Sequence, residues 1–393
     1  MTFSSLPLSY CTNVHPGRTV QEVVAGLTQY TAQVRRDFDH PLAAGLWMAR
    51  SAVTELLEDP QSLELLAQTL WQHDLCCYTL NAFPYGDFHS ERVKENVYLP
   101  DWTSNDRVRY TRDCATILAQ LLPEGAEGSI STVPLGGEMN PSGPEFHATC
   151  FHHLIQMARF LKDLHTQTGR RIRLAVEPEP MCHMSSIPNQ VVPQFQALFA
   201  LADALNCEAD VREYIGLCFD VCHQAVEFEL IPKSFDQLAD AGIRLNKIHI
   251  TNAIELLSPR ENSAGREALS GFVEPRYLHQ TFARFSDGRI VRKLDLNQEI
   301  LSATDDEFMQ ADAWRVHFHV PVYATELGPL RTTRPDLEAA LKRLARLDYA
   351  PHLEVETYTW PVMPGTGNSQ PDQLASRICQ ELQSATDLIA DSV

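Results

Sequence analysis

The stretch Gly216-Leu217-Cys218-Phe219-Asp220-Val221-Cys222-His223-Gln224 has the pattern of a short buried strand that ends at a carboxylate, with an imidazole three residues later. Buried parallel strands are near-continuous apolar runs. An aspartate at the carboxyl end of such a strand lies at the mouth of the sheet, where (β/α)8 barrels carry out their chemistry. Asp220 and His223 are therefore candidate metal ligands, because carboxylate oxygens and imidazole nitrogens both bind divalent cations.

Three other apolar runs end in the same way. Glu177 follows the run Arg173–Val176, His249 follows Lys247-Ile248, and Glu356 follows His352–Val355. In a barrel, the carboxyl ends of these strands meet at one mouth, so the four side chains converge there. Any one of these residues alone is a weak signal, whereas the four together predict a metal site made of Glu177, Asp220, His249 and Glu356.

The rest of the chain supports a barrel. Apolar strand-like runs alternate with amphipathic helical stretches, which predicts an α/β protein with one (β/α)8 TIM barrel. The expected strands are Leu6–Val14, Gly45–Met48, Leu75–Leu80, Ser129–Val133, Arg171–Val176, Ile215–Phe219, Leu245–Ile250 and His352–Tyr358. After the seventh strand the alternation is broken by an insertion at about 259–320, where Asp287-Gly288 between alternating runs indicates a hairpin. We see no linker rich in Gly, Ser or Pro, so residues 1–393 are predicted to form a single domain.

Composition limits the partners and the location. The net charge is -19 and the chain has no run of Lys and Arg, which argues against nucleic-acid binding. No apolar run reaches the roughly 18 residues of a membrane span. The segment Met1–Tyr10 lacks the pattern of a signal peptide, and the ten cysteines are expected to be reduced thiols. These features predict a cytoplasmic protein with a small-molecule partner.

The predicted site favours isomerase or epimerase chemistry. Several carboxylates in one pocket require a cation, and one or two ions of Mn, Co, Zn or Mg suit this ligand set. A divalent ion can hold and polarise a hydroxy-carbonyl compound. Glu177 and Glu356 could then remove and return a proton, with His223 as the third catalytic residue. The substrate would be a sugar, a sugar phosphate or a cyclitol-type polyol.

Two alternatives remain open at this point. The protein could be a carrier that binds a metabolite without converting it, or a metal-dependent hydrolase of a phosphoester or glycosidic bond. His317 and His319 share one face of an extended segment, because side chains alternate along a strand. They could hold a second metal together with His223. Further candidates for the second metal or the substrate lie near other strand ends: His15, Asn81 and Glu179.

The strand-end residues resemble the xylose-isomerase-like TIM-barrel superfamily, which includes sugar isomerases, sugar epimerases and the type IV endonucleases that cut at abasic sites. The metal positions of that superfamily fall on Glu177, Asp220, His249 and Glu356, and its helper histidine falls on His223. The endonucleases hold three zinc ions with additional histidines on the third and fourth strands. Here those strand ends carry Asn81 and Val133-Pro134, which argues against DNA cleavage. The Asp-x-His pair of the family appears as His317-x-His319.

Four short segments of the sequence resemble a narrower family. The segments Tyr10–Gly17, Tyr78–Gly86, His317–Pro321 and Leu353–Trp360 are similar to the EboE-type metabolite traffic proteins. This resemblance implies a role in making or trafficking a small, cyclitol-type metabolite. It also implies partners among the proteins of the same biosynthetic cluster.

Overall fold

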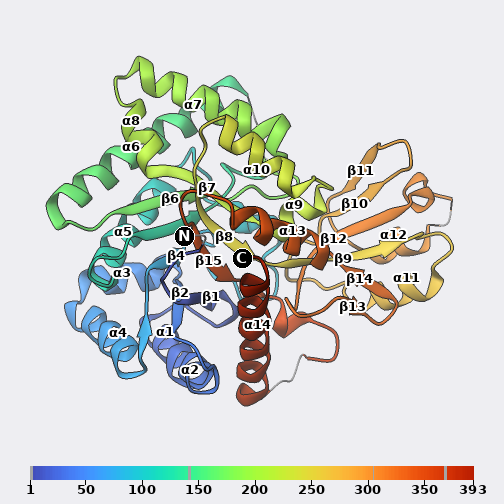
Figure 1. Cartoon of the computed structure of the whole chain (residues 1–393), viewed down its shortest axis with the longest axis horizontal. Coiled ribbons are helices and arrows are strands. Elements are labelled where there is room, and N and C mark those ends of the chain that lie inside the picture. Colours follow the sequence, from blue (N-terminus) through green and yellow to red (C-terminus); the bar gives the residue numbers. More distant parts are fainter. Residues whose placement is uncertain (1–2, 140–142, 304, 367–369) are drawn as a thin grey trace.

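Parallel strands close into a barrel at the centre of the molecule (Figure 1). The computed structural model describes residues 3–139, 143–303, 305–366 and 370–393. The strands are β1 (Leu8–Cys11), β2 (Leu42–Trp47), β4 (Thr79–Asn81), β5 (Gly128–Thr132), β6 (Ile172–Val176), β7 (Ile215–Asp220), β8 (Leu245–Ile250) and β15 (His352–Val355). They pair in the order β1-β15-β8-β7-β6-β5-β4-β2, and pairing of β1 with β2 closes the barrel. The prediction of a (β/α)8 barrel is confirmed.

The third predicted strand is interrupted. Its first part, β3 (Leu75–Cys76), and its second part, β4, both pair with β2. Pairing with β2 resumes after Cys77 and Tyr78, whose side chains are both buried. The chain therefore reaches the barrel mouth at Asn81 even though the strand is not continuous.

Helices surround the barrel (Figure 1). They are α1 (Val20–Gly26), α2 (Ala32–Asp37), α3 (Arg50–Glu58), α4 (Pro60–Gln72), α5 (Asn105–Leu121), α6 (Pro144–Thr168), α7 (Val192–Ala204), α8 (Glu208–Tyr214), α9 (Val221–Val226), α10 (Ile231–Asp240), α13 (Arg334–Leu344) and α14 (Pro371–Asp391). With helices outside and side chains filling the barrel, all six residues of β7 and all six of β8 are buried. This burial on both faces explains the apolar run of β7, whereas β8 carries Asn246, Lys247 and His249 among its apolar residues.

A second, antiparallel sheet lies beside the barrel (Figure 1). Its strands pair in the order β11-β10-β12-β9-β14-β13. The elements of this region are β9 (Asn252–Leu257), α11 (Ser263–Ser270), β10 (Thr281–Arg284), β11 (Ile290–Lys293), α12 (Gln298–Ser302), β12 (Ala313–Val320), β13 (Glu326–Leu327) and β14 (Leu330–Thr332). The hairpin of β10 and β11 turns through Gly288, whose φ of 85° suits glycine.

This sheet extends beyond the predicted insertion of about 259–320. It begins at β9, directly after β8, and ends at β14, because β9 pairs with both β12 and β14. Only Thr251 and Asn252 separate the apolar residues of β8 from those of β9 in the sequence, and neither a glycine nor a proline marks the change of sheet. The pairing of β12 with β9 shifts register between Val316 and Val320. Such an irregularity redirects side chains.

Two segments cover the mouth of the barrel. One is the loop between β4 and α5, residues 82–104, and the other is residues 271–280 of the region after β8. The backbone N–H groups of Val93 and Lys94 both donate to Arg276 O at 2.8 Å. The Lys94 ammonium donates to Tyr277 O at 2.6 Å and pairs with Asp295 at 2.7 Å. In the described part of the chain, no helix combines the length and apolarity needed to cross a membrane.

Candidate metal centre and pocket

Four neighbouring barrel strands bring the predicted ligand residues together. Glu177 follows β6, Asp220 is the last residue of β7, His249 lies near the end of β8 and Glu356 follows β15. These strands are consecutive in the sheet, and Asp220 is the register partner of His249. One ligand atom from each of the four residues lies within 4.8 Å of the other three, and all four side chains are buried. We call these four residues the acidic set.

The carboxylates of the acidic set surround one imidazole nitrogen. His249 Nδ1 lies 3.0 Å from Glu177 Oε1, 3.0 Å from Glu356 Oε2 and 3.4 Å from Asp220 Oδ2. Burial opposes a charge on His249, but Cys218, Glu177 and Glu356 outweigh it and hold the pKa of the imidazole well above its usual value. Three buried carboxylates need a positive charge among them. A proton on His249 or a metal cation could supply it.

Hydrogen bonds fix the outer oxygen of two of these acids. Glu356 Oε1 accepts hydrogen bonds from the side-chain amides of Asn13 and Asn81, each at 2.8 Å. Asp220 Oδ1 accepts one from the Thr251 hydroxyl at 2.7 Å. Each acid is thereby held with its second oxygen turned toward His249, an arrangement typical of ligands that are oriented by outer hydrogen bonds.

Two carboxylate oxygens of the acidic set lack a hydrogen-bond donor among the described residues. Glu177 Oε2 and Asp220 Oδ2 are buried and accept no hydrogen bond from the described residues. A buried carboxylate oxygen without a donor costs free energy unless a cation lies beside it. Three carboxylates and one imidazole are ligands that Mn²⁺, Co²⁺, Zn²⁺ and Mg²⁺ accept in proteins. The donor set therefore fits a divalent metal.

Three imidazoles form a second cluster beside the acidic set, which we call the histidine set. Their rings approach closely, with 4.5 Å between the centroids of His223 and His317 and 5.3 Å between those of His317 and His319. Each ring donates its Nδ1 hydrogen to an oxygen that only accepts: His223 to Pro178 O, His317 to Gln280 Oε1 and His319 to Glu356 O. The Nε2 atoms of neutral rings then carry lone pairs.

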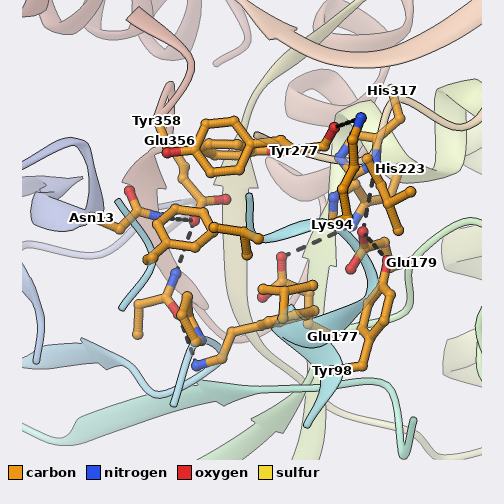
Figure 2. Close-up of a pocket in the computed structure, with 17 residues that line it drawn as sticks. Asn13, Lys94, Tyr98, Glu177, Glu179, His223, Tyr277, His317, Glu356 and Tyr358 are labelled. Atoms are coloured by element: carbon orange, nitrogen blue, oxygen red, sulfur yellow. Dashed lines mark hydrogen bonds and ion pairs between the residues drawn. The ribbon is translucent and has the colours of Figure 1, made fainter. Parts of the chain in front are cut away.

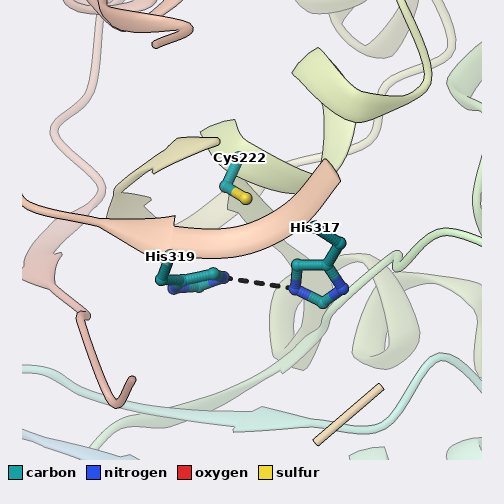
Figure 3. Close-up of side chains that lie close together, drawn as sticks. All are labelled: Cys222, His317 and His319. Carbon is teal, nitrogen blue, oxygen red and sulfur yellow. Dashed lines mark hydrogen bonds between the residues drawn. The ribbon is translucent and has the colours of Figure 1, made fainter. Parts of the chain in front are cut away.

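Two of these Nε2 atoms lie close together. His317 Nε2 lies 3.3 Å from His319 Nε2 (Figure 3). Burial, together with His223 and His319, holds the pKa of His317 well below its usual value, so this ring is neutral. Two nitrogen ligands on a tetrahedral zinc, each about 2.0–2.1 Å from the metal, are separated by about 3.3–3.4 Å. His317 and His319 therefore have the spacing of two ligands of one cation.

Cys222 also lies near His317 and His319, but its environment is apolar. Its side chain packs with Val226, Ala253 and Phe282. In Figure 3 the sulfur and the two imidazoles appear on different sides of strand β12. Burial raises the pKa of the thiol well above its usual value. Cys222 is a packing residue in this arrangement.

Glu179 links the two clusters. Its Oε1 accepts a hydrogen bond from Tyr98 OH at 2.7 Å and lies 3.5 Å from His317 Nδ1. Burial raises the pKa of Glu179 to about 7. The side chain lines the same pocket as Glu177 and Glu356 (Figure 2), so it is within reach of a ligand bound there.

A pocket opens above the acidic set (Figure 2). It contains about 490 Å³ of space free of protein atoms, part of it open to solvent, which is within the range of roughly 300–1,000 Å³ for small-molecule sites. Its polar lining includes Asn13, Asn81, Glu177, His223 and Glu356. The apolar wall comes mainly from the two segments that cover the mouth, and consists of Phe83, Pro84, Phe88, Val93, Val97, Tyr277, Leu278 and Tyr358.

One predicted candidate lies apart from the others. His15 does not line this pocket, and its Nε2 lies 3.1 Å from Tyr10 OH. The His15 ring stacks on Tyr30 with 4.4 Å between centroids, and burial lowers the pKa of His15 to about 3. The structure therefore gives His15 a packing role, whereas Asn81, Glu179, His223 and His317 all reach the pocket.

Several residues at the site had not been predicted. Asn13 and Thr251 each follow a strand end closely, so the rule that found Asn81 could have found them. Gln280 comes from the segment before β10, where the sequence has no periodicity that points to a pocket. Gln280 donates to Tyr98 OH at 2.9 Å and orients His317.

The chain resembles solved structures of barrel enzymes in fold. A structure of D-psicose 3-epimerase in the presence of D-fructose has 11% identity and a TM-score of 0.50, covering 98% of this chain and 99% of that one. The D-allulose 3-epimerase from Methylomonas sp. has 14% identity and a TM-score of 0.49, with full coverage of both chains. The IOLI protein with a bound zinc atom has 14% identity, a TM-score of 0.47 and 99% coverage of each chain.

No protein-family model matches the chain, and neither does any curated protein. The structural likeness to D-psicose 3-epimerase therefore shows the fold alone, a (β/α)8 barrel.

Proposed function

We propose that the acidic set binds one divalent cation and that the protein isomerises or epimerises a sugar, a sugar phosphate or a cyclitol-type compound. One observation carries this proposal. Three carboxylates and one imidazole converge within 4.8 Å at the mouth of the barrel, beneath a pocket of ligand size. The likeness of the fold to D-psicose 3-epimerase supports a sugar-like substrate.

The side chains have distinct roles in this proposal. When bound, the cation would hold the carbonyl and hydroxyl oxygens of the substrate and polarise the carbonyl. Glu177 and Glu356 come from different strands, and both line the pocket. One carboxylate removes the proton from the carbon beside the carbonyl, and the other returns a proton to it. His223 is held through Nδ1 and turns Nε2 to the pocket, where it would hydrogen-bond a substrate oxygen.

We infer further that this reaction belongs to a pathway that makes or traffics a small metabolite. The strings that resemble EboE-type proteins include Asn13, Asn81, His317, His319 and Glu356, all of which lie at the site. In that pathway the protein would act in the cytoplasm beside proteins of the same biosynthetic cluster.

The first experiment measures the metal content of the purified protein by elemental analysis. The comparison is with an Asp220→Ala/His249→Ala variant and with His152→Ala, which changes an exposed histidine of α6. We expect about one equivalent in the wild type and in the control, and background in the double variant. A wild type that takes up no added Mn²⁺, Co²⁺ or Zn²⁺ would contradict the proposal.

The metal-loaded protein is then incubated in D₂O with ketoses, their phosphates and cyclitol ketones. Uptake of deuterium beside the carbonyl, followed by NMR, detects proton removal before any product is known. Ligand binding without exchange or turnover would instead favour a metabolite carrier.

A second candidate function is metal-dependent hydrolysis of a phosphoester or glycosidic bond. The observation that favours it is the 3.3 Å spacing of His317 Nε2 and His319 Nε2 in the histidine set. A second cation there would activate a water molecule beside the first. Two equivalents of metal in the wild type and hydrolysis of p-nitrophenyl phosphates or glycosides would support this function. One equivalent, with His317 and His319 dispensable for turnover, would rule it out.

A further inference from the structure

The pocket above the acidic set has a polar floor and an apolar wall (Figure 2). The floor includes Glu177 and Glu356, and the wall is the group of eight residues described with the pocket. Three rings of the wall pack together: the centroid of Phe88 lies 4.9 Å from that of Tyr277 and 5.3 Å from that of Tyr358. Each of these side chains is less than a tenth exposed, so the wall is held by contacts within the protein. The two sides of the pocket therefore suit different parts of one molecule.

The apolar wall offers few hydrogen bonds to a ligand. Among its eight side chains, the polar atoms are the hydroxyls of Tyr277 and Tyr358. A sugar ring can stack one face on an aromatic side chain, but the hydroxyls at its edge still need partners. Hydroxyls that face apolar side chains without a partner cost free energy, whereas an apolar group in the same place gains it. The wall therefore suits an apolar group better than a second hydroxylated surface.

Lys94 is the one lysine or arginine among the described residues that line the pocket. A lysine ammonium has three hydrogens to donate. Those of Lys94 are used on Glu274 O at 3.1 Å, Tyr277 O at 2.6 Å and Asp295 Oδ2 at 2.7 Å. The ammonium therefore joins the two segments that cover the mouth and is not free to hold an anionic group of a ligand.

The carboxylates of the pocket also oppose an anionic ligand. His223 Nδ1 lies 3.9 Å from Glu177 Oε1, and His317 Nδ1 lies 3.5 Å from Glu179 Oε1. A proton on either imidazole would therefore be balanced by an acid that is already beside it. The three carboxylates of the acidic set exceed the two positive charges of one divalent cation. A phosphate group in the pocket would meet like charge, which is unfavourable.

The part of a barrel that frequently binds phosphate has a different structure in this chain. In (β/α)8 enzymes that site is formed by the loops after the seventh and eighth strands and the N-terminus of a short helix. Here the seventh barrel strand, β8, passes through Thr251 directly into β9, and the Thr251 hydroxyl donates to Asp220. After the eighth barrel strand, β15, the chain places Glu356 in the acidic set and Tyr358 in the wall. This edge of the pocket therefore presents a carboxylate and an aromatic ring.

We propose that the ligand of this pocket is an uncharged polyol or hydroxy-ketone that carries an apolar substituent. Its oxygens lie on the polar floor, and its substituent lies against the apolar wall. This inference rests on the proposed function and narrows its substrate class. Of the sugars, sugar phosphates and cyclitol-type compounds considered there, it selects uncharged compounds with an apolar part.

The test uses D-fructose, D-fructose 6-phosphate, and the 1-O-benzyl and 6-O-benzyl ethers of D-fructose. Isothermal titration measures the Kd of each compound for the protein with and without added Mn²⁺. Two variants change the wall: Phe88→Ala removes a ring, and Val97→Thr adds a hydroxyl at nearly constant shape, so that the wall is still tested if Phe88→Ala does not fold. Leu65→Ala, which changes an exposed leucine of α4, is the control.

We expect at least one ether to bind about 10-fold or more tightly than D-fructose, because it buries apolar surface against the wall. D-fructose 6-phosphate should bind more weakly than D-fructose, because its charge faces carboxylates. Both wall variants should reduce the preference for the ether and keep the Kd of D-fructose within about threefold, and Leu65→Ala should change neither value.

Three results would each overturn the inference. They are a phosphate that binds as tightly as D-fructose, two ethers that bind no more tightly than D-fructose, and a preference for the ether that is unchanged in the folded wall variants. A wild type that takes up no metal rejects the proposed function, whereas the order of the affinities decides this inference.

Discussion

The acidic set and the histidine set lie side by side, but they differ in charge and in the sheet that carries them. The acidic set comes from four parallel barrel strands and carries an excess of carboxylates. The histidine set takes His317 and His319 from β12 of the antiparallel sheet, and it consists of imidazoles alone. The difference indicates that the barrel provides the carboxylates, while the added sheet brings imidazoles to the edge of the site.

The electrostatics of Asp220 connect the two sets. Burial acts to raise the pKa of Asp220, but His223, His319 and His249 outweigh it and hold the pKa below its usual range. Two of these three imidazoles belong to the histidine set. Imidazoles of both sets therefore act on the charge of Asp220.

The largest effect is expected from the two catalytic carboxylates of the acidic set. Glu177→Gln and Glu356→Gln keep the side-chain size but remove the base, so turnover of the substrate found in the exchange screen should fall about 10²–10⁴-fold. The measurement is kcat/KM with saturating Mn²⁺. If both variants bind metal and turn over the substrate as fast as the wild type, the isomerase assignment is wrong. Glu338→Gln, on the exposed face of α13, is the matched control.

A smaller effect is expected from the histidine set. Should the histidine set bind the second cation of the hydrolase alternative, His317→Ala/His319→Ala removes two of its direct ligands and should weaken that binding by about 100-fold or more. Competition titration with Zn²⁺ measures both sites in one experiment. The tighter site should stay within about threefold of the wild type, since all four residues of the acidic set remain. Loss of both sites together would mean that the two sets form one centre.

The two sets also differ in how far they could be predicted from sequence. In parallel strands, burial on both faces favours apolar residues, and a polar residue at the carboxyl end of the strand lies at the mouth. This local signal located Glu177, Asp220, His249 and Glu356 in the sequence, and the structure brings them together. The same rule applied to Asn13 and Thr251 would have added the donors that orient the acids.

The surroundings of the histidine set had no such signal. The period of two placed His317 and His319 on one face, and the structure does turn their rings toward each other. Their partner Gln280 lies far away in the sequence, and the register shift of β12 between Val316 and Val320 depends on pairing with β9. His15 is the opposite case. It follows a strand end in the sequence, but in the structure its ring packs against Tyr10 and Tyr30 and does not line the pocket.

The smallest effect is expected from the amides that orient Glu356. Asn13→Ala and Asn81→Ala each remove one of two donors to Oε1, so each should weaken metal binding to the acidic set about 10-fold, at the low end of losses of outer hydrogen bonds. Isothermal titration with Mn²⁺ measures this affinity. Because the two amides share one oxygen, the double variant should lose more than the sum of the single free-energy changes. Additive losses would instead show that each amide acts on the pocket separately, and that Glu356 is held in place by the barrel strand alone.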